Sequence, residues 1–157
     1  MSTSVLSLYR RLTRWPCGRW LFARAVCFKA PYFATISPRF VRLEPGVCEV
    51  AIRDRRRVHN HIGTVHAIAL CNLAELAAGV MTDATIPASM RWIPKGMSVE
   101  YLKKATGPLQ GVATPDIAVV EAAAGYDLPV TVVVKDRSGE AVFRARIAMW
   151  VSPRSKH

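Results

Sequence analysis

The fold of this chain is decided by the stretch AIALCNLAELAAG at residues 67–79, which follows the polar loop NHIGTVH at residues 60–66. The spacing of its apolar residues predicts one helix over about residues 66–84, ending before Pro87. A helix that is apolar on nearly every side must be enclosed by the rest of the protein. At about 100° per residue, one narrow stripe of this helix contains Ile68, Asn72, Glu75, Gly79 and Thr82.

The segments on either side of this helix have the patterns of strands. Two extended segments are predicted before it, at residues 34–43 and 47–54, with a turn at Pro45-Gly46. After it, alternating or β-branched residues predict strands at about 97–104, 109–114, 130–135 and 143–151. Two strands, one apolar helix and four further strands predict an α+β domain in which a single antiparallel sheet curls around the helix.

The composition describes one globular domain. The chain has 157 residues, of which 51% are hydrophobic and 21% charged, and this length suits a single domain with a substantial core. The apolar run at residues 67–81 is shorter than the roughly 20 residues of a membrane-spanning helix. Arginines interrupt the N-terminus too often for a secretory leader, and the four cysteines have no metal-binding spacing. We therefore expect a cytoplasmic protein with reduced thiols.

The net charge of +11 is concentrated at the N-terminus, where eight bases and no acid precede Glu44. Helical spacing predicts helices at residues 4–14 and 16–29, so residues 1–30 form a basic helical arm and residues 31–157 the domain. Two interpretations of the arm remain open. It is an amphipathic element peripheral to a membrane surface, or it packs on its own domain or a partner subunit. The aromatic residues between the bases are too sparse for nucleic-acid stacking, so no nucleic-acid partner is expected.

The helix also carries the elements of a reaction site. Asn72 and Glu75 form either a buried hydrogen-bonded pair or part of an active site. The first amide N–H groups of a helix lack intrahelical partners and stabilise an oxyanion, here near Ala67. Glu75 lies about 12 Å further along the axis, so one chain cannot bring both groups to one carbon. Two antiparallel helices in a homodimer can, each site taking its amide from one subunit and its carboxylate from the other.

The pattern Asn60-x-x-Gly63-x-x-His66, with Glu75 nine positions after the histidine, resembles the hot-dog fold acyl-CoA thioesterases. The similar groups are the phenylacetyl-CoA and 4-hydroxybenzoyl-CoA types and an uncharacterised branch, over about residues 34–152. The resemblance implies that Glu75 acts as nucleophile or general base and that the Ala67 N–H polarises the thioester carbonyl. It also implies that Asn60 orients water or substrate and that His66 completes the catalytic set at the helix start.

Further residues are expected to contact the substrate. Gly63, Ile68, Asn72 and Gly79 are candidates for substrate binding, and the phosphates of coenzyme A have the surface candidates Lys95, Lys103 and Lys104. Coenzyme A enters only as part of the substrate, and no other cofactor is expected. No metal is expected either, because neither a cysteine nor an acid completes a set with the nearby histidines. The expected assembly is a homodimer or a dimer of dimers.

Two alternatives to the enzyme remain open. The family commonly has two glycines where this chain has Ala67 and Ile68. Because Ile68 lies on the Glu75 stripe, it would narrow an acyl channel, which favours a hot-dog protein that binds an acyl thioester or lipid without hydrolysing it. The basic arm favours a membrane-surface interaction module.

Overall fold

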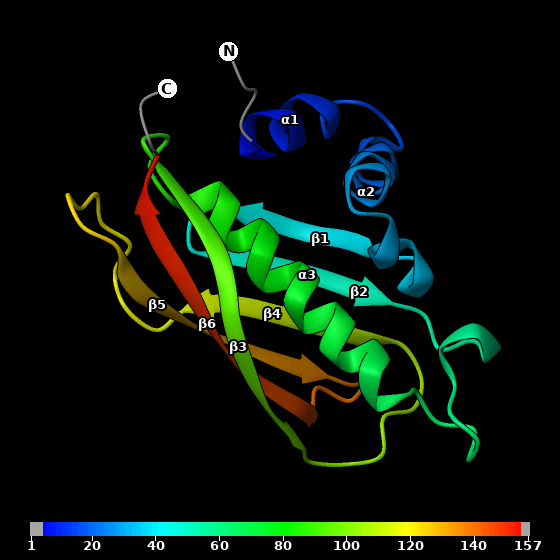
Figure 1. Cartoon of the computed structure of the whole chain (residues 1–157). Helices are drawn as coiled ribbons and strands as arrows, with labels where there is room; N and C mark the ends of the chain where they lie inside the picture. Colours follow the sequence, from blue (N-terminus) through cyan, green and yellow to red (C-terminus); the bar gives the residue numbers. More distant parts are fainter. Residues whose placement is uncertain (1–4, 155–157) are drawn as a thin grey trace.

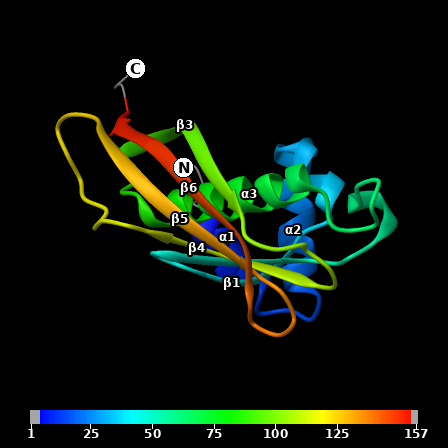
Figure 2. The same ribbon diagram turned by 90° about the horizontal axis from the view of Figure 1, so that it is seen from below.

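The computed structural model describes residues 5–154, in which a curved sheet wraps around one long helix (Figures 1 and 2). The long helix is α3 (Ala67–Thr85), and the N-terminal arm forms α1 (Val5–Leu12) and α2 (Gly18–Lys29). Two short 3-10 helices, η1 (Pro31–Ile36) and η2 (Arg56–Val58), lie before α3. The strands are β1 (Arg39–Glu44), β2 (Val47–Ile52), β3 (Met90–Tyr101), β4 (Leu109–Pro115), β5 (Tyr126–Lys135) and β6 (Ala141–Pro153).

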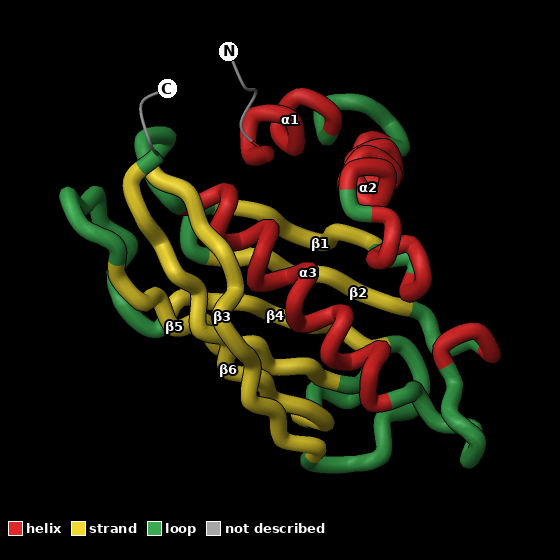
Figure 3. The backbone as a smooth tube through the Cα atoms, viewed as in Figure 1, coloured by secondary structure: helices red, strands yellow, loops and turns green. Residues whose placement is uncertain are grey.

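All strands of the described sheet pair antiparallel, in the order β1-β2-β4-β5-β6-β3. The strand that follows α3 in the chain therefore lies at the edge of the sheet furthest from β1 and β2 (Figure 3). This strand, β3, pairs with β6 on one side and has no partner on its other side within residues 5–154. The predicted antiparallel sheet around one helix is confirmed, and β3 presents a free edge.

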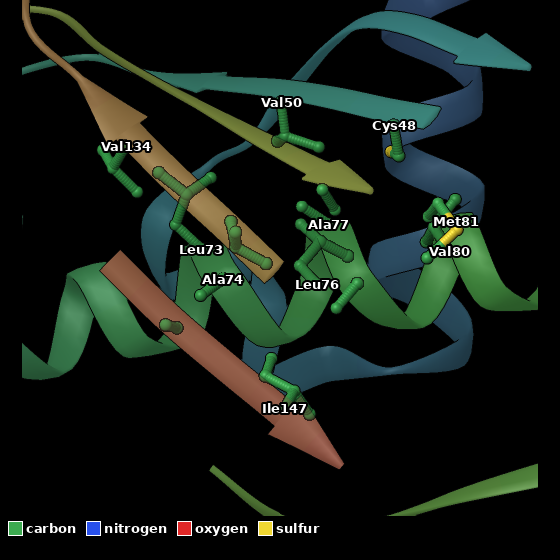
Figure 4. Packing of buried hydrophobic residues seen from close by; sticks show 14 of the residues in the cluster. Cys48, Val50, Leu73, Ala74, Leu76, Ala77, Val80, Met81, Val134 and Ile147 are labelled. Atoms are coloured by element: carbon green, nitrogen blue, oxygen red, sulfur yellow. The ribbon is translucent and has the colours of Figure 1, made fainter. Parts of the chain in front are cut away.

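Alternation of side chains builds the core between the sheet and α3. In β2, Cys48, Val50 and Ile52 are buried, and in β6 the buried side chains alternate with the exposed Arg144 and Arg146. Figure 4 shows Leu73, Leu76 and Ala77 of α3 packed among residues of the surrounding strands. This two-residue period is what a strand with one face on the core requires.

The helix α3 has 19 residues and begins one residue after the predicted start. By length and composition alone it could cross a membrane, contrary to the expectation that this apolar run is too short. Most of it is enclosed by the sheet, so it is the core helix of the domain. All four cysteines are free, and burial raises the pKa of Cys27 and Cys48. The two buried cysteines therefore pack as small apolar side chains.

Three predicted strands differ from the structure by more than two residues. The strand predicted at residues 130–135 is β5, which begins earlier, at Tyr126. The predicted strand at residues 34–43 is a 3-10 helix up to Ile36, and β1 begins only at Arg39 because Pro38 separates the two. The strand predicted at residues 97–104 begins earlier, at Met90, and ends at Tyr101. Pro94 and Gly96 interrupt its alternation, and the register shifts between them. Such an irregularity is tolerated because this is an edge strand.

The arm packs on its own domain. Its predicted start at Ser4 lies outside the described residues, but α1 and α2 otherwise agree with the prediction. Tyr9 of α1, Phe22 of α2 and Phe40 of β1 form a ladder of edge-to-face rings, with centroids 5.0 and 4.8 Å apart. Aromatic pairs in this geometry add to the stabilisation gained from burial. The ladder fixes the arm against the sheet edge.

Candidate functional site

The first half of α3 leaves an open strip on the surface. Ile68 is 54% exposed, and Glu75, about two helical turns further along, is also exposed. The Glu75 carboxylate has no hydrogen-bond or ion-pair partner among the described residues. Asn72 does not bond to Glu75, so the interpretation of these two residues as a buried hydrogen-bonded pair is wrong. We call Ile68 and Glu75 the open strip.

The start of α3 leaves one donor free. His66 is the N-cap, and its Nδ1 accepts a hydrogen bond from the Ile68 N–H at 3.0 Å. The His66 carbonyl accepts the N–H groups of Ala69 and Leu70. The Ala67 N–H has no partner within residues 5–154. This amide is therefore available for a negative charge at the helix terminus.

The loop before α3 is organised by Asn60. Its Oδ1 accepts the N–H groups of Ile62 and Thr64, both at 3.1 Å, and its Nδ2 donates to Thr64 Oγ1 at 2.8 Å. Gly63 has a φ of +79°, which only glycine adopts readily, and nothing crowds it. The Asn60 side chain therefore shapes the loop that leads into the helix. Its contact with water or substrate stays a prediction.

A pair of residues that the sequence analysis missed anchors this loop. His59 Nε2 donates to Asp54 Oδ1, and the Gly107 N–H donates to Asp54 Oδ2 at 2.6 Å. The hydrogen bond from His59, assisted by Gly107, holds the pKa of Asp54 below its usual value. Asp54 is the one acid between Glu49 and Glu75 in the sequence, a signal that could have drawn attention to it. The residues that the structure describes contain no group of three metal-ligating side chains.

A pocket of about 170 Å³ opens beside the first half of α3. Asn72 lies in it, only 5% exposed, with its Nδ2 donating to Thr35 Oγ1 at 3.0 Å. Its Oδ1 is buried and has no partner among the described residues, although buried acceptors are normally satisfied. Asn72 is therefore a polar side chain at the pocket whose acceptor oxygen is not used by any described residue. The pocket is lined by Tyr32, Thr35, Ile36, Arg57, Val58, His59, His66, Ile68, Ala69 and Asn72.

A larger hollow of about 600 Å³ lies on the outer face of the sheet, away from α3. Its charged groups are already paired. Arg144 lies 3.4 Å from Glu100, and Arg146 lies 3.3 Å from Asp116. The smaller pocket, with its unsatisfied acceptor and its position beside the helix start, is the better candidate for ligand binding.

The second half of α3 is closed. A Cβ on Gly79 would lie 2.9 Å from the Trp92 ring, so the absent side chain makes room for Trp92. Trp92 Nε1 donates to Asp83 Oδ1 at 3.3 Å, and Thr82 is fully buried with its hydroxyl donating to the Ala78 carbonyl. Gly79 therefore packs against Trp92 of its own chain, where a substrate contact was expected. Only the N-terminal part of the predicted stripe is open.

The candidate lysines differ in what they contact. Lys95 pairs with Asp127 at 3.0 Å and lies 4.9 Å from the centroid of the Trp150 ring, and Lys103 pairs with Glu140. Lys104 is exposed and has no ion pair in the described part of the chain. Arg57 is at the pocket itself. Arg57 is therefore the base best placed to meet a phosphate at the pocket, and Lys104 is the one candidate lysine without an ion pair among the described residues.

Solved structures share this architecture. A crystal structure named only as genomics target APC5556 is 48% identical, with a TM-score of 0.82, covering 96% of this chain and 99% of that one. A thioesterase family protein from Silicibacter pomeroyi is 18% identical, with a TM-score of 0.71, covering 84% and 96%. The thioesterase HI1161 from Haemophilus influenzae is 12% identical, with a TM-score of 0.69, covering 80% and 85%. The last two likenesses show the fold alone.

A family model described as a domain of unknown function, DUF4442, matches residues 18–151, which include α2 as well as the sheet and α3. No curated protein matches the chain. The sheet around one helix, shared with the thioesterase structures, confirms the predicted hot-dog fold. This chain is therefore a hot-dog protein that belongs to the DUF4442 family.

Proposed function

We propose that this protein hydrolyses acyl thioesters, acyl-CoA among them, at composite sites between two copies of the chain. The observation that carries the proposal is the pair of unpartnered groups on α3: the Ala67 N–H at the helix start and the Glu75 carboxylate on the open strip. An unsatisfied donor and a free carboxylate, on the helix whose Ile68, Ala69 and Asn72 line the pocket, are parts that acyl transfer requires. The thioesterases named above, which share the fold, support the same class of reaction.

The separation of the two groups supports a dimer. Eight residues of helix place Glu75 about 12 Å from Ala67 along the axis, too far for one reacting carbon. The free edge of β3 and its exposed Ile93, Met97 and Tyr101 give two copies an apolar, hydrogen-bonding surface on which to pair. A two-fold axis there would bring the two open strips together in antiparallel directions. Association of two such dimers into a tetramer is compatible with this arrangement.

The chemistry assigns each group a role. The Ala67 N–H of one subunit stabilises the oxyanion that forms when the thioester carbonyl is attacked. Glu75 of the other subunit either removes a proton from the attacking water or attacks the carbon itself. Water is added across the carbon–sulfur bond, giving a carboxylic acid and a free thiol. His66 and Asn60 position the helix start and its loop, and Arg57 and Lys104 are candidates for the phosphates of coenzyme A.

A second function, binding an acyl thioester or lipid without hydrolysis, is favoured by one observation. Ile68 lines the pocket and stands on the open strip between the helix start and Glu75. A panel of acyl-CoA substrates separates the two functions, because only hydrolysis releases a free thiol. Binding with no thiol release by the wild-type protein would select the second function.

The composite site is tested with Ala67→Pro and Glu75→Gln. Proline fits the first position of a helix, and His66 already has the extended backbone, at ψ 139°, that a residue before proline needs. Ala67→Pro therefore removes the N–H donor with little change in structure. Each variant alone should lose most activity, and each should keep the wild-type unfolding temperature.

Mixed dimers of the two variants are then purified through two different tags. In a composite arrangement one of the two sites receives both an intact amide and an intact carboxylate, so about half of the wild-type activity should return. Sites confined to one chain would give mixed dimers with no recovery, which would contradict the composite arrangement. Full activity in either single variant would contradict the assignment of that residue.

A further inference from the structure

The helix α2 has one buried and one exposed apolar face. Phe22, Ala23 and Cys27 are buried against the domain. On the opposite face Trp20 is 62% exposed, Leu21 42% and Phe28 91%. Two further exposed aromatic residues flank the helix in the sequence, Trp15 at 71% and Tyr32 at 66% exposed. We call these five exposed residues, Trp15, Trp20, Leu21, Phe28 and Tyr32, the arm surface.

The charged residues of the arm are all bases. The described part of the chain before Glu44 contains no acid, and no base of α1 or α2 forms an ion pair in the structure. Arg24 lies between Trp20 and Phe28 on the exposed side of the helix, four residues after the first and four before the second. The exposed bases of the two helices and of the turn between them are Arg10, Arg11, Arg14, Arg19, Arg24 and Lys29.

We propose that the arm surface docks on an anionic lipid bilayer. Tryptophan, phenylalanine and leucine gain free energy when they enter the boundary between headgroups and acyl chains, and arginine and lysine are attracted to the anionic lipids around them. Such a surface needs a partner that is both apolar and negatively charged. A second copy of the arm surface is not that partner, because it would bring the same positive charges face to face.

The packing of the arm makes the docking rigid. The Tyr9–Phe22–Phe40 ring ladder holds the buried side of the arm against β1, so the exposed side keeps a fixed direction relative to the domain. The two interpretations of the arm are thus compatible. One face packs on the domain and the other remains free for the membrane.

The arm surface also adjoins the pocket. Tyr32 belongs to the arm surface and lines the pocket, together with Thr35 and Ile36 of the same 3-10 helix. Docking would therefore hold the pocket mouth beside the bilayer. If the proposed thioesterase function holds, this placement favours acyl thioesters whose long chains dissolve in the membrane over short-chain, soluble ones.

Co-sedimentation with vesicles tests the docking. The full chain should bind vesicles of phosphatidylcholine with phosphatidylglycerol and bind vesicles of phosphatidylcholine alone much more weakly. Trp20→Ser combined with Phe28→Ser should lower the partition coefficient about tenfold or more, because two aromatic side chains no longer enter the bilayer. Ile117→Ser combined with Val120→Ser is the matched control: these residues are 47% and 50% exposed on a distant loop and should leave binding unchanged.

The charge requirement is tested separately. Arg19→Glu combined with Arg24→Glu should weaken binding to the anionic vesicles, and added salt should weaken wild-type binding in the same way. Equal binding to neutral vesicles, no binding at all, or unchanged binding by the Trp20 and Phe28 variant would overturn the proposal. So would tight binding to DNA with no preference for vesicles.

This proposal can fail independently of the proposed function. The arm variants should hydrolyse a soluble short-chain acyl-CoA at the wild-type rate, because none of their residues lies at Ala67 or Glu75. Glu75→Gln should still bind anionic vesicles. Loss of vesicle binding in Glu75→Gln would show that the arm surface is not the docking element and would overturn the proposal.

Discussion

One stripe of residues runs along both halves of α3, but the surroundings of the stripe differ between the two halves. In the first half, Ile68 and Glu75 are open to solvent, and Asn72 reaches into a pocket. In the second half, Gly79 and Thr82 lie on the same side of the helix and are buried. Trp92 of β3 makes the difference because its ring lies against Gly79 and closes that end.

The comparison extends to the two carboxylates of the helix. Asp83 is in the closed half and accepts a hydrogen bond from Trp92 Nε1, so it takes part in holding the closure together. Glu75 in the open half has no partner within residues 5–154. A polar residue with a partner in its own chain is explained by structure, whereas an exposed carboxylate without a partner, in the middle of the core helix, needs another explanation. This contrast is the reason for assigning chemistry to Glu75 and not to Asp83.

The largest expected effect is on turnover, to which only one of these two carboxylates should contribute. Glu75→Gln should lower the rate of acyl-CoA hydrolysis by about 10²–10⁴-fold, the usual contribution of a general base. Asp83→Asn, the matched control on the same helix, should keep the wild-type rate. Thiol release measured under saturating substrate checks both. Equal losses in the two variants would mean that the open half is no more reactive than the closed one.

The next largest effect concerns the closure. Gly79→Val should destabilise the protein by about 1–3 kcal/mol, since extra atoms in a filled space force neighbours to move. The midpoint of urea unfolding measures the change. In a Trp92→Ala background the same valine should be tolerated, because the ring that it meets has gone. A full effect of valine in that background would show that something other than Trp92 closes the second half.

Sequence periodicity predicted which helices and strands form better than it predicted the residues at which each begins and ends. The helix expected over residues 66–84 is α3, at Ala67–Thr85, and the strand expected over 109–114 is β4, at Leu109–Pro115. These elements have one face on the core, so their pattern records their surroundings. The edge strand β3 has little buried surface and is interrupted at Pro94 and Gly96, so its pattern is weak and its start was missed.

The candidate site was predictable in part for the same reason. The polar stripe, the His66 cap and the Glu75 carboxylate belong to one helix, whose geometry one segment determines. The pocket depends on Thr35, which meets Asn72 across 37 residues of the chain. It also depends on η1, which the sequence pattern assigned to a strand. Contacts between distant segments are not recorded in the periodicity of either one, so the pocket required the structure.

Asn72 allows the pocket to be tested with a smaller effect on stability. Asn72→Leu removes a buried oxygen that has no partner among the described residues, but it also removes the hydrogen bond to Thr35 Oγ1. The first change favours the folded state and the second disfavours it, so the free energy of unfolding should change by about 1 kcal/mol or less. The affinity for acyl-CoA should fall, because the leucine fills part of the pocket and offers no acceptor. Isothermal titration measures the affinity, and unchanged affinity would remove Asn72 from the binding site.

The smallest effect concerns the anchor of the loop that leads into the open half. The hydrogen bond from His59 lowers the pKa of Asp54 in the folded protein. As pH falls, the unfolded chain therefore binds this proton first. Asp54 contributes stability that is fully present above its unfolded pKa of about 4 and is lost as pH falls through the lower, folded-state pKa. At neutral pH, Asp54→Asn should unfold at a lower urea concentration than the wild type.

The pH dependence separates this electrostatic anchor from simple packing. The difference in urea midpoint between wild type and Asp54→Asn should shrink as the pH is lowered from 7 to below about 4, since the wild type loses its charged partner there. Asp83→Asn, which leaves the His59 contact intact, serves as the control. If the difference stays constant over this range, the Asp54 charge does not stabilise the fold. The loop before the open half is then held by its other contacts, the hydrogen bonds of Asn60 and the backbone bonds to Ala105 and Val58.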